Sequence, residues 1–205
     1  MGFYVLSQRE ESGCQAGMLN AALCDKFYED MDNIEYGDFP WYSEKGRSKN
    51  RTPLPEGMVL ISKDKYYDFD IRGISRFYYI VSDEFLDLCF SLSVEVIDSA
   101  KIKVLSIKGE SISKKNYNVV IFNELDARLD TDPTSTFVED EGRPIRFKKL
   151  VIPHGLGLDL FKYSRMLSGS DSLICSEQFK IKADNFKGVN FFSLDGLIWS
   201  SVKRI

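Results

Sequence analysis

Carboxylates in two short stretches are the side chains of this sequence best suited to catalysis. Asp68 and Asp70 form one pair, and Asp126, Asp130 and Asp132 form a second group. Carboxylate oxygens bind Mg²⁺ and Ca²⁺, and a pair of acids can also hydrolyse a glycosidic bond. The spacing matches no calcium-binding loop, so solvated acids in loops are the simpler interpretation. If these acids are catalytic, the protein is an enzyme that uses a loop carboxylate cluster, with or without a metal ion. This is the alternative to the binding function considered below.

Other catalytic motifs are not supported by their context. His154 lies between Pro153 and Gly155, where a turn and a solvated imidazole are expected, although any Ser-His-Asp or Cys-His site would have to use it. The glycine pair Gly155 and Gly157 lacks the third glycine and the following helix of a dinucleotide fingerprint. The sequence contains neither a G-x-S-x-G elbow nor a phosphate-binding P-loop. We therefore expect no catalytic residue, no cofactor and no metal ion.

Acidic residues interleaved with aromatic ones indicate a protein-binding surface instead. One group lies in a long irregular segment, 29–57, and another in a second acidic loop, 123–142. Acids steer a basic partner surface, of which a nuclease active site is an example, and aromatic side chains anchor it. The alternative is that the acids are merely solvated and the aromatic side chains pack into the core. The candidate partner-binding residues are Glu29, Asp30, Asp32, Glu35, Asp38, Trp41, Tyr42, Asp126, Asp130, Asp132, Glu139, Asp140 and Glu141.

Length, composition and charge narrow the class of protein. The 205 residues suit a single domain, and 43% hydrophobic with 28% charged residues is ordinary for a globular protein. A net charge of −4 disfavours nucleic acid as the main partner. No apolar run is long enough for a membrane helix, and the four cysteines lack C-x-x-C spacing. We expect reduced thiols in a cytoplasmic protein that binds neither membrane nor nucleic acid.

A pattern that occurs twice in the sequence predicts where two helices begin. An apolar run leads to Ser82 and again to Ser176, an acid follows each serine, and Phe85 or Phe179 begins an apolar face. A serine at the N-cap accepts a backbone N–H, and an early carboxylate is stabilised at the positive helix end. We therefore expect two helices that begin directly after strands, and an ancient internal duplication is one explanation.

The remaining periodicities predict an α+β fold with a mixed, mostly antiparallel sheet and a few short helices. A helix is expected at 15–28, with Met18, Leu19, Ala22 and Leu23 on one face, and at 83–92 the apolar stripe is Phe85, Leu86, Cys89 and Phe90. A second capped helix is expected at 177–184, and 197–199 should pack on the core. Strands are expected at 3–6, 58–61, within 66–82, and at 102–107, 117–122, 147–152, 159–162, 172–175 and 189–193.

The order of motifs from Phe77 onward resembles a family of bacterial immunity proteins. The matching stretches are Phe77–Asp83, Tyr117–Asp126 with Asp130 and Ser135, Ile145–Ile152, Leu158–Lys162, Leu173–Phe179 and Phe186–Phe191. These stretches cover about two thirds of the chain, 77–193, and the resemblance is to immunity protein family eleven, formerly a domain of unknown function. Phe179 stands where the family usually has a Leu-like residue, and the last helix is expected to be shorter than in the family.

The resemblance implies a non-enzymatic protein, encoded beside a secreted or polymorphic antibacterial toxin, that binds and neutralises this toxin stoichiometrically. It implies one domain over 1–205, with a family-like core at 77–193 and an N-terminal segment, 1–66, that matches loosely. It supplies no binding residues, because such proteins diverge on the surface that meets the toxin. The acidic positions above are therefore a hypothesis drawn from charge alone.

Overall fold

Strands dominate the computed structural model, which describes residues 2–32, 34–36, 39–42, 52–164 and 173–194, with the backbone alone for 143–145. One sheet has six strands in the order β2-β3-β6-β7-β5-β4. Their bounds are Ala21–Cys24 (β2), Met58–Ser62 (β3), Val96–Ser106 (β6), Tyr117–Phe122 (β7), Tyr79–Ser82 (β5) and Ile71–Gly73 (β4). Each pair is antiparallel except β3 with β6.

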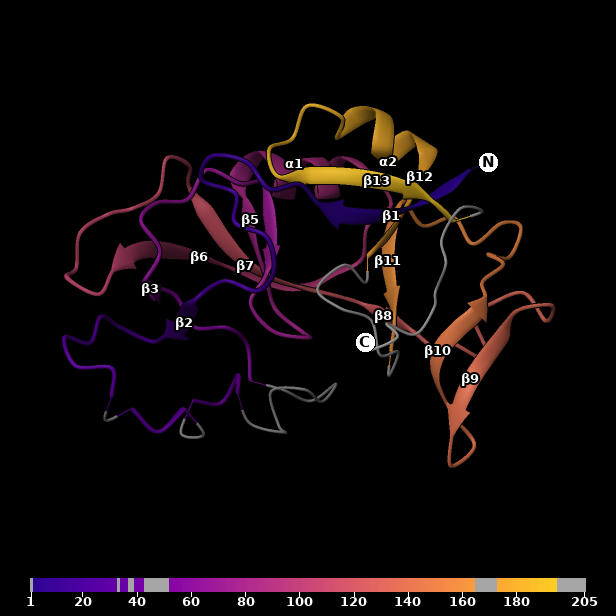
Figure 1. The fold of residues 1–205 in the computed structure, drawn as a ribbon, viewed down its shortest axis with the longest axis horizontal. Coiled ribbons are helices and arrows are strands. Elements are labelled where there is room, and N and C mark those ends of the chain that lie inside the picture. Colours follow the sequence, from indigo (N-terminus) through magenta and orange to yellow (C-terminus); the bar gives the residue numbers. More distant parts are fainter. Residues whose placement is uncertain (1, 33, 37–38, 43–51, 165–172, 195–205) are drawn as a thin grey trace, which may run out of the picture.

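A second sheet has five strands in the order β13-β1-β12-β11-β8 and lies beside the first (Figure 1). Their bounds are Val189–Ser193 (β13), Phe3–Gln8 (β1), Ile174–Ser176 (β12), Leu160–Tyr163 (β11) and Glu124–Leu125 (β8). A separate two-stranded ribbon projects at one end, formed by β9 (Thr136–Asp140) and β10 (Arg143–Lys149). The described helices are α1 (Asp83–Ser91) and α2 (Glu177–Lys182), so the sheets are mixed as expected but the helical share is smaller than α+β suggests.

Both described helices begin at the serines that the sequence indicates. The Ser82 hydroxyl accepts a hydrogen bond from Phe85 N at 3.1 Å, and the Ser176 hydroxyl accepts one from Phe179 N at 3.1 Å. An acid occupies the first turn of each helix, where it is stabilised by the positive end of the helix dipole. The sequence therefore predicted both helix starts correctly.

These serines belong to two capped units with the same order of elements. The first capped unit runs from Asp70 to Phe122 as β4, β5, α1, β6 and β7, with the strands side by side in the order β6-β7-β5-β4. The second capped unit runs from Asp159 to Ser193 as β11, β12, α2 and β13, with the strand order β13-β1-β12-β11. Here β1 takes the place of β7, and all three strand pairs of each unit are antiparallel.

The backbone contacts of the two units correspond in detail. Asp83 N donates to Asn116 O, directly before β7, and Glu177 N donates to Gly2 O, directly before β1. Leu92 N donates to Cys89 O after α1, and Phe186 N donates to Ala183 O after α2. Each of these pairs lies at the same distance from its capping serine, so β1 is the structural equivalent of β7.

An aspartate in each unit holds both its own serine and the other unit. The Asp70 carboxylate accepts from the Ser82 hydroxyl, and it also accepts from Lys187 N at 2.7 Å. The Asp159 carboxylate accepts from the Ser176 hydroxyl and from Ser93 N at 3.1 Å. Lys187 and Ser93 each lie eleven residues after the capping serine of the opposite unit. The two aspartates thus join the units reciprocally.

The core between the units is formed by the helices and the strand faces below them. Phe85 and Phe179 are fully buried, with ring centroids 5.7 Å apart in an edge-to-face arrangement. Both helices lie on the same side of the two sheets (Figure 1). Phe90, which was expected in the apolar stripe of α1, is 63% exposed, so that expectation was wrong at its last residue.

Two further expectations differ from the structure, and a third is not tested by it. The helix expected at 15–28 is wrong, because Ala21–Cys24 pairs with β3 as an edge strand and the preceding residues form bends and turns. The segment 123–142 was expected to be an acidic loop. It contains the strand β8, which begins two residues after the end of β7, and the strand β9. The predicted packing of 197–199 lies outside the described residues.

Within the described part of the chain, no helix has the length and apolar character needed to span a bilayer.

Candidate partner-binding surface

The acids of the first group lie in the segment of the chain that connects β2 to β3. Glu29, Asp30, Asp32 and Glu35 are exposed, while Asp38 lies outside the described residues. The Asp30 carboxylate accepts the Asp32 N–H at 2.9 Å, which bends this part of the segment. Four acids are therefore presented to solvent along residues 29–35, and this stretch is called the acidic segment below.

The two aromatic candidates next to this segment close the edge of the six-stranded sheet. Trp41 is 6% exposed, stacks on Phe39 at 4.9 Å and donates from Nε1 to Leu23 O at 3.0 Å. The Tyr42 hydroxyl is half-buried and accepts the Leu23 N–H at 2.8 Å. Both outward backbone groups of Leu23 are thus satisfied by side chains, so the Trp41 ring belongs to the core, as in the alternative interpretation.

The acids of the second group occupy two different environments. Glu139, Asp140 and Glu141 are exposed at the tip of the β9–β10 ribbon, where Glu141 and Gly142 have positive φ angles of 47° and 72°. This conformation is typical of a two-residue hairpin turn. Arg128 donates to Glu139 at 2.5 Å and to Gly142 O at 2.9 Å, so it braces the tip against the neighbouring loop.

Asp126, Asp130 and Asp132 stabilise loop turns with their carboxylates. Asp126 accepts from Arg128 N and Leu129 N, and Asp130 accepts from Asp126 N. The Thr134 hydroxyl and backbone N–H, which both donate to Asp132, lower the pKa of this carboxyl below its ordinary value. These carboxylates face their own backbone, an arrangement that explains the loop without any ligand.

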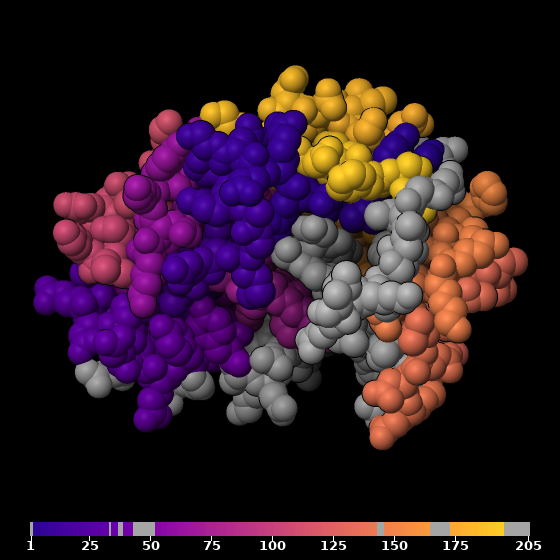
Figure 2. Space-filling view, in the orientation of Figure 1, coloured from indigo at the N-terminus to yellow at the C-terminus, as the bar shows by residue number. Residues whose placement is uncertain are grey.

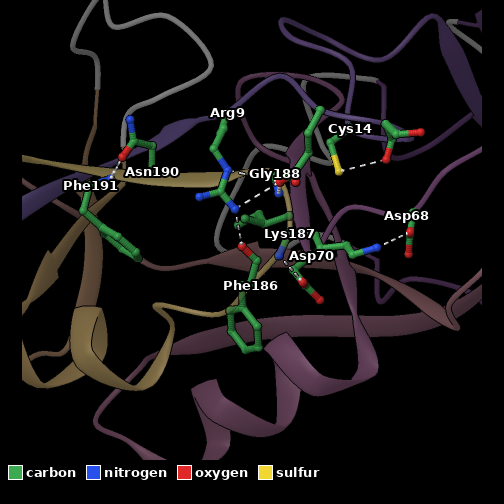
Figure 3. A network of polar contacts seen from close by, with 12 residues as sticks. Arg9, Cys14, Asp68, Asp70, Phe186, Lys187, Gly188, Asn190 and Phe191 are labelled. Atoms are coloured by element: carbon green, nitrogen blue, oxygen red, sulfur yellow. Dashed lines mark hydrogen bonds and ion pairs between the residues drawn. The ribbon is translucent and has the colours of Figure 1, made fainter.

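Asp68 and Asp70 are held by lysines and backbone groups. Lys187 Nζ lies 2.5 Å from Asp68, and Lys115 Nζ lies 2.6 Å from Asp70. Figure 3 shows Lys187 reaching Asp68 with its side chain while its backbone N–H faces Asp70. The hydrogen bond from Lys187 to Asp68 raises the pKa of the lysine. The described residues contain no group of three or more His, Cys, Asp or Glu side chains placed to hold a metal ion.

Arg72 fastens this network to the first residues of the chain. Its side chain is almost fully buried and donates to the carbonyls of Gln15 at 2.7 Å, Gly188 at 2.8 Å and Arg9 at 3.1 Å. A built Cβ on Gly188 would lie 2.7 Å from the Arg72 guanidinium, so the close approach requires glycine there. The network around Asp68 and Asp70 is therefore a structural junction between the sheets.

The acidic segment and the ribbon tip project on the same side of the molecule, at opposite ends of its long axis (Figure 1). In the space-filling view they form two separate lobes, one indigo to purple and the other orange (Figure 2). The sequence-predicted acids thus form two exposed groups, and Asp126, Asp130 and Asp132 lie at the base of the second. Sequence reasoning missed Arg128 as the brace of the ribbon, because nothing local links it to Glu139.

Comparison with known proteins gives one family. A family model described as Immunity protein 43 matches residues 9–200, which includes both capped units except the strand β1. The match is thus to an immunity protein family, as expected, but to family 43 and not to family eleven. It also extends across the N-terminal segment that was expected to match only loosely. No curated protein matches this sequence.

Proposed function

This chain belongs to the immunity protein 43 family, and we propose that it neutralises a cognate antibacterial toxin by binding it stoichiometrically. The family match, which covers most of the chain, is the observation that carries this proposal. Catalysis is not required for such a role, because a protein that occupies the toxin's active surface blocks it by mass action. We propose that the protein acts in the bacterial cytoplasm, where a toxin would reach its target.

The two exposed acidic groups are the proposed contact surface. The acidic segment and the ribbon tip are both exposed and point to the same side, so one basic partner surface could meet both. Complementary charge raises association rates and disfavours partners of the same sign. Because the Trp41 ring is buried, the aromatic contribution near the acidic segment falls to more exposed rings such as Tyr36, which is 40% exposed.

Capture of a partner from the native cells tests the binding function. The tagged chain is expected to retain a single protein in equimolar amount, with a toxin domain encoded beside this gene. Co-expression at graded ratios then separates inhibition from catalysis, since an inhibitor protects only when it is at least equimolar to the toxin. Protection far below that ratio would contradict the proposal and favour an enzyme.

Charge reversal tests the contact surface separately. We expect Lys substitutions at the acidic segment and Asp38 together to lower the association rate by about tenfold or more, with a smaller effect on dissociation. The control reverses two exposed acids that are not candidate binding residues, Glu56 and Glu110, and the two effects are compared per reversed charge. An unchanged association rate at low salt would rule out the acidic segment and leave the ribbon tip as the proposed contact.

A further inference from the structure

A pocket of about 520 Å³ lies against β2, the edge strand of the six-stranded sheet, and against the neighbouring strand β3. This volume is within the range of pockets that hold small ligands or anchoring side chains. Its lining combines apolar side chains, among them Met31, Ile61 and Ile107, with Asp32, Tyr36 and Lys63. The pocket therefore joins the acidic segment to the edge of a sheet, and it is separate from the Asp68 and Asp70 junction.

The outer edge of β2 carries backbone polar groups at residues next to this pocket. Asn20 O accepts from Lys63 N on the β3 side, whereas Leu23 N–H and C=O face outward to Tyr42 and Trp41. Successive residues of an antiparallel edge strand alternate between these two directions. The N–H and C=O of Ala21 therefore face outward like those of Leu23, and Ala21 lines the pocket.

The side chains at the pocket favour a cation. Asp32 is exposed and stands in the acidic segment, so three further carboxylates reinforce its potential. Tyr36 lies edge-to-face with Tyr42, with ring centroids 5.8 Å apart, and its ring is 40% exposed. Aromatic faces attract cations, and a guanidinium group stacks on them more readily than an ammonium group does. Lys63 repels a cation at its own part of the lining, which directs the cation toward Asp32 and Tyr36.

We propose that this pocket receives an arginine side chain of the toxin, an inference that rests on the proposed function. The guanidinium pairs with Asp32, stacks on Tyr36 and donates to the Ala21 carbonyl. Arginine fits better than lysine because its planar group carries five donors and binds carboxylates in a fixed geometry. The acidic segment thereby supplies a defined anchoring contact in addition to long-range attraction.

Titration of the isolated protein with N-acetyl-arginine amide, followed by amide NMR, tests the pocket directly. We expect shifts at Ala21, Ala22 and Tyr36, and none with the uncharged isostere N-acetyl-citrulline amide. Asp32→Asn should weaken this binding about tenfold, because the guanidinium loses its ion pair with the carboxylate and keeps only a neutral amide oxygen as acceptor. Glu29→Gln removes the same charge from the acidic segment outside the lining and should change it less than about twofold.

Absence of shifts at the pocket, or equal effects of Asp32→Asn and Glu29→Gln, would overturn this assignment. The captured toxin distinguishes it from the proposed function. If the wild-type protein retains the toxin while Asp32→Asn and Tyr36→Ala bind it as tightly as Glu29→Gln, the pocket is not the anchor and the immunity function stands. If the wild-type protein retains no toxin, the proposed function fails, and the toxin-anchor role of the pocket fails with it.

Discussion

The first capped unit is continuous in the sequence, whereas the second is closed by a strand from the far end of the chain. In the first, β7 follows β6 directly; in the second, β1 precedes all the strands with which it pairs. Their local sequences share little beyond the serine, the acid and the phenylalanine. What recurs is the set of hydrogen bonds that satisfies backbone groups at the helix starts and ends. The comparison shows that this bonding pattern, and not chain continuity, defines the unit.

The two units also differ in the charge around their aspartates. Asp70 is 1% exposed and pairs with Lys115 besides accepting from Ser82 and Lys187 N. Asp159 is half-buried, and no lysine or arginine of the described residues pairs with it. A buried carboxylate requires more compensation than a partly solvated one, which accounts for the additional lysine in the first unit.

Removal of Gly2–Gln8 should destabilise the second capped unit more than any other change considered. Without β1, the strands β12 and β13 lose their shared neighbour, so the second unit cannot close. We expect loss of most of the stability, which for a domain is about 5–15 kcal/mol in total. Urea unfolding followed by circular dichroism measures the loss, and a synthetic peptide of residues 1–10 added in excess should restore part of it. A truncated protein with an unchanged unfolding midpoint would refute the equivalence of β1 and β7.

Alanine at the equivalent phenylalanines tests whether the helices share one core. Phe85→Ala and Phe179→Ala should each lower the free energy of unfolding by about 3–5 kcal/mol, because both rings are fully buried. The double variant should lose less than the sum by roughly 0.5–1.5 kcal/mol, since the rings contact each other. Denaturant unfolding of the four proteins gives the coupling. Full additivity would mean that the two helices are stabilised independently.

Asparagine at the two aspartates sharpens the electrostatic difference. Asp70→Asn should cost roughly 3 kcal/mol, because a charged hydrogen bond to Lys115 is lost in a buried site. Asp159→Asn should cost roughly 1–2 kcal/mol, since only hydrogen bonds to neutral donors are weakened. Chemical denaturation at neutral pH compares the variants. Equal losses would show that Lys115 contributes little.

The smallest effect is expected at Glu11, which has no counterpart in the first unit. Gly188 N–H donates to its carboxylate at 2.5 Å, and this bond lowers the pKa of Glu11. A lowered pKa gives stability that is present above the unfolded value of about 4.3 and is lost as the pH falls through the folded value. Glu11→Gln should therefore cost a few tenths of a kcal/mol at neutral pH, because the group is largely solvated. The difference in thermal midpoint from wild type should shrink in acid; a difference that grows there would contradict this sign.

Local sequence patterns were sufficient to predict the helices and strands whose ends are fixed by neighbouring residues. Ser82 and Ser176 each cap a helix through their own hydroxyl, and the uniformly apolar run at Tyr117–Phe122 is a fully buried strand. In both cases the deciding interaction is either local or a simple consequence of burial. The same reasoning identified the acidic segment, because charge and exposure usually accompany each other.

Other features depend on partners distant in sequence. Met18 to Leu23 has helical spacing, but pairing of β2 with β3, together with Trp41 and Tyr42 at its outer edge, determines the local structure. Trp41 was predicted to bind a partner because it lies close to acidic residues, and no local signal shows that its Nε1 donates to Leu23 O. The pairing of β1 with β12 and β13 could not be derived, since β1 alone is compatible with many neighbours.

The position of β1 also affects the order of events during synthesis. This strand leaves the ribosome before its partners β12 and β13 exist, while β4 to β7 emerge together and can pair early. At about 5–20 residues per second, the roughly 180 residues between Gln8 and Val189 take about 10–40 s to make. During this time the apolar residues of β1 are without their native neighbours. We therefore expect the yield of native protein to depend on translation speed and on any factor that shields nascent apolar chain.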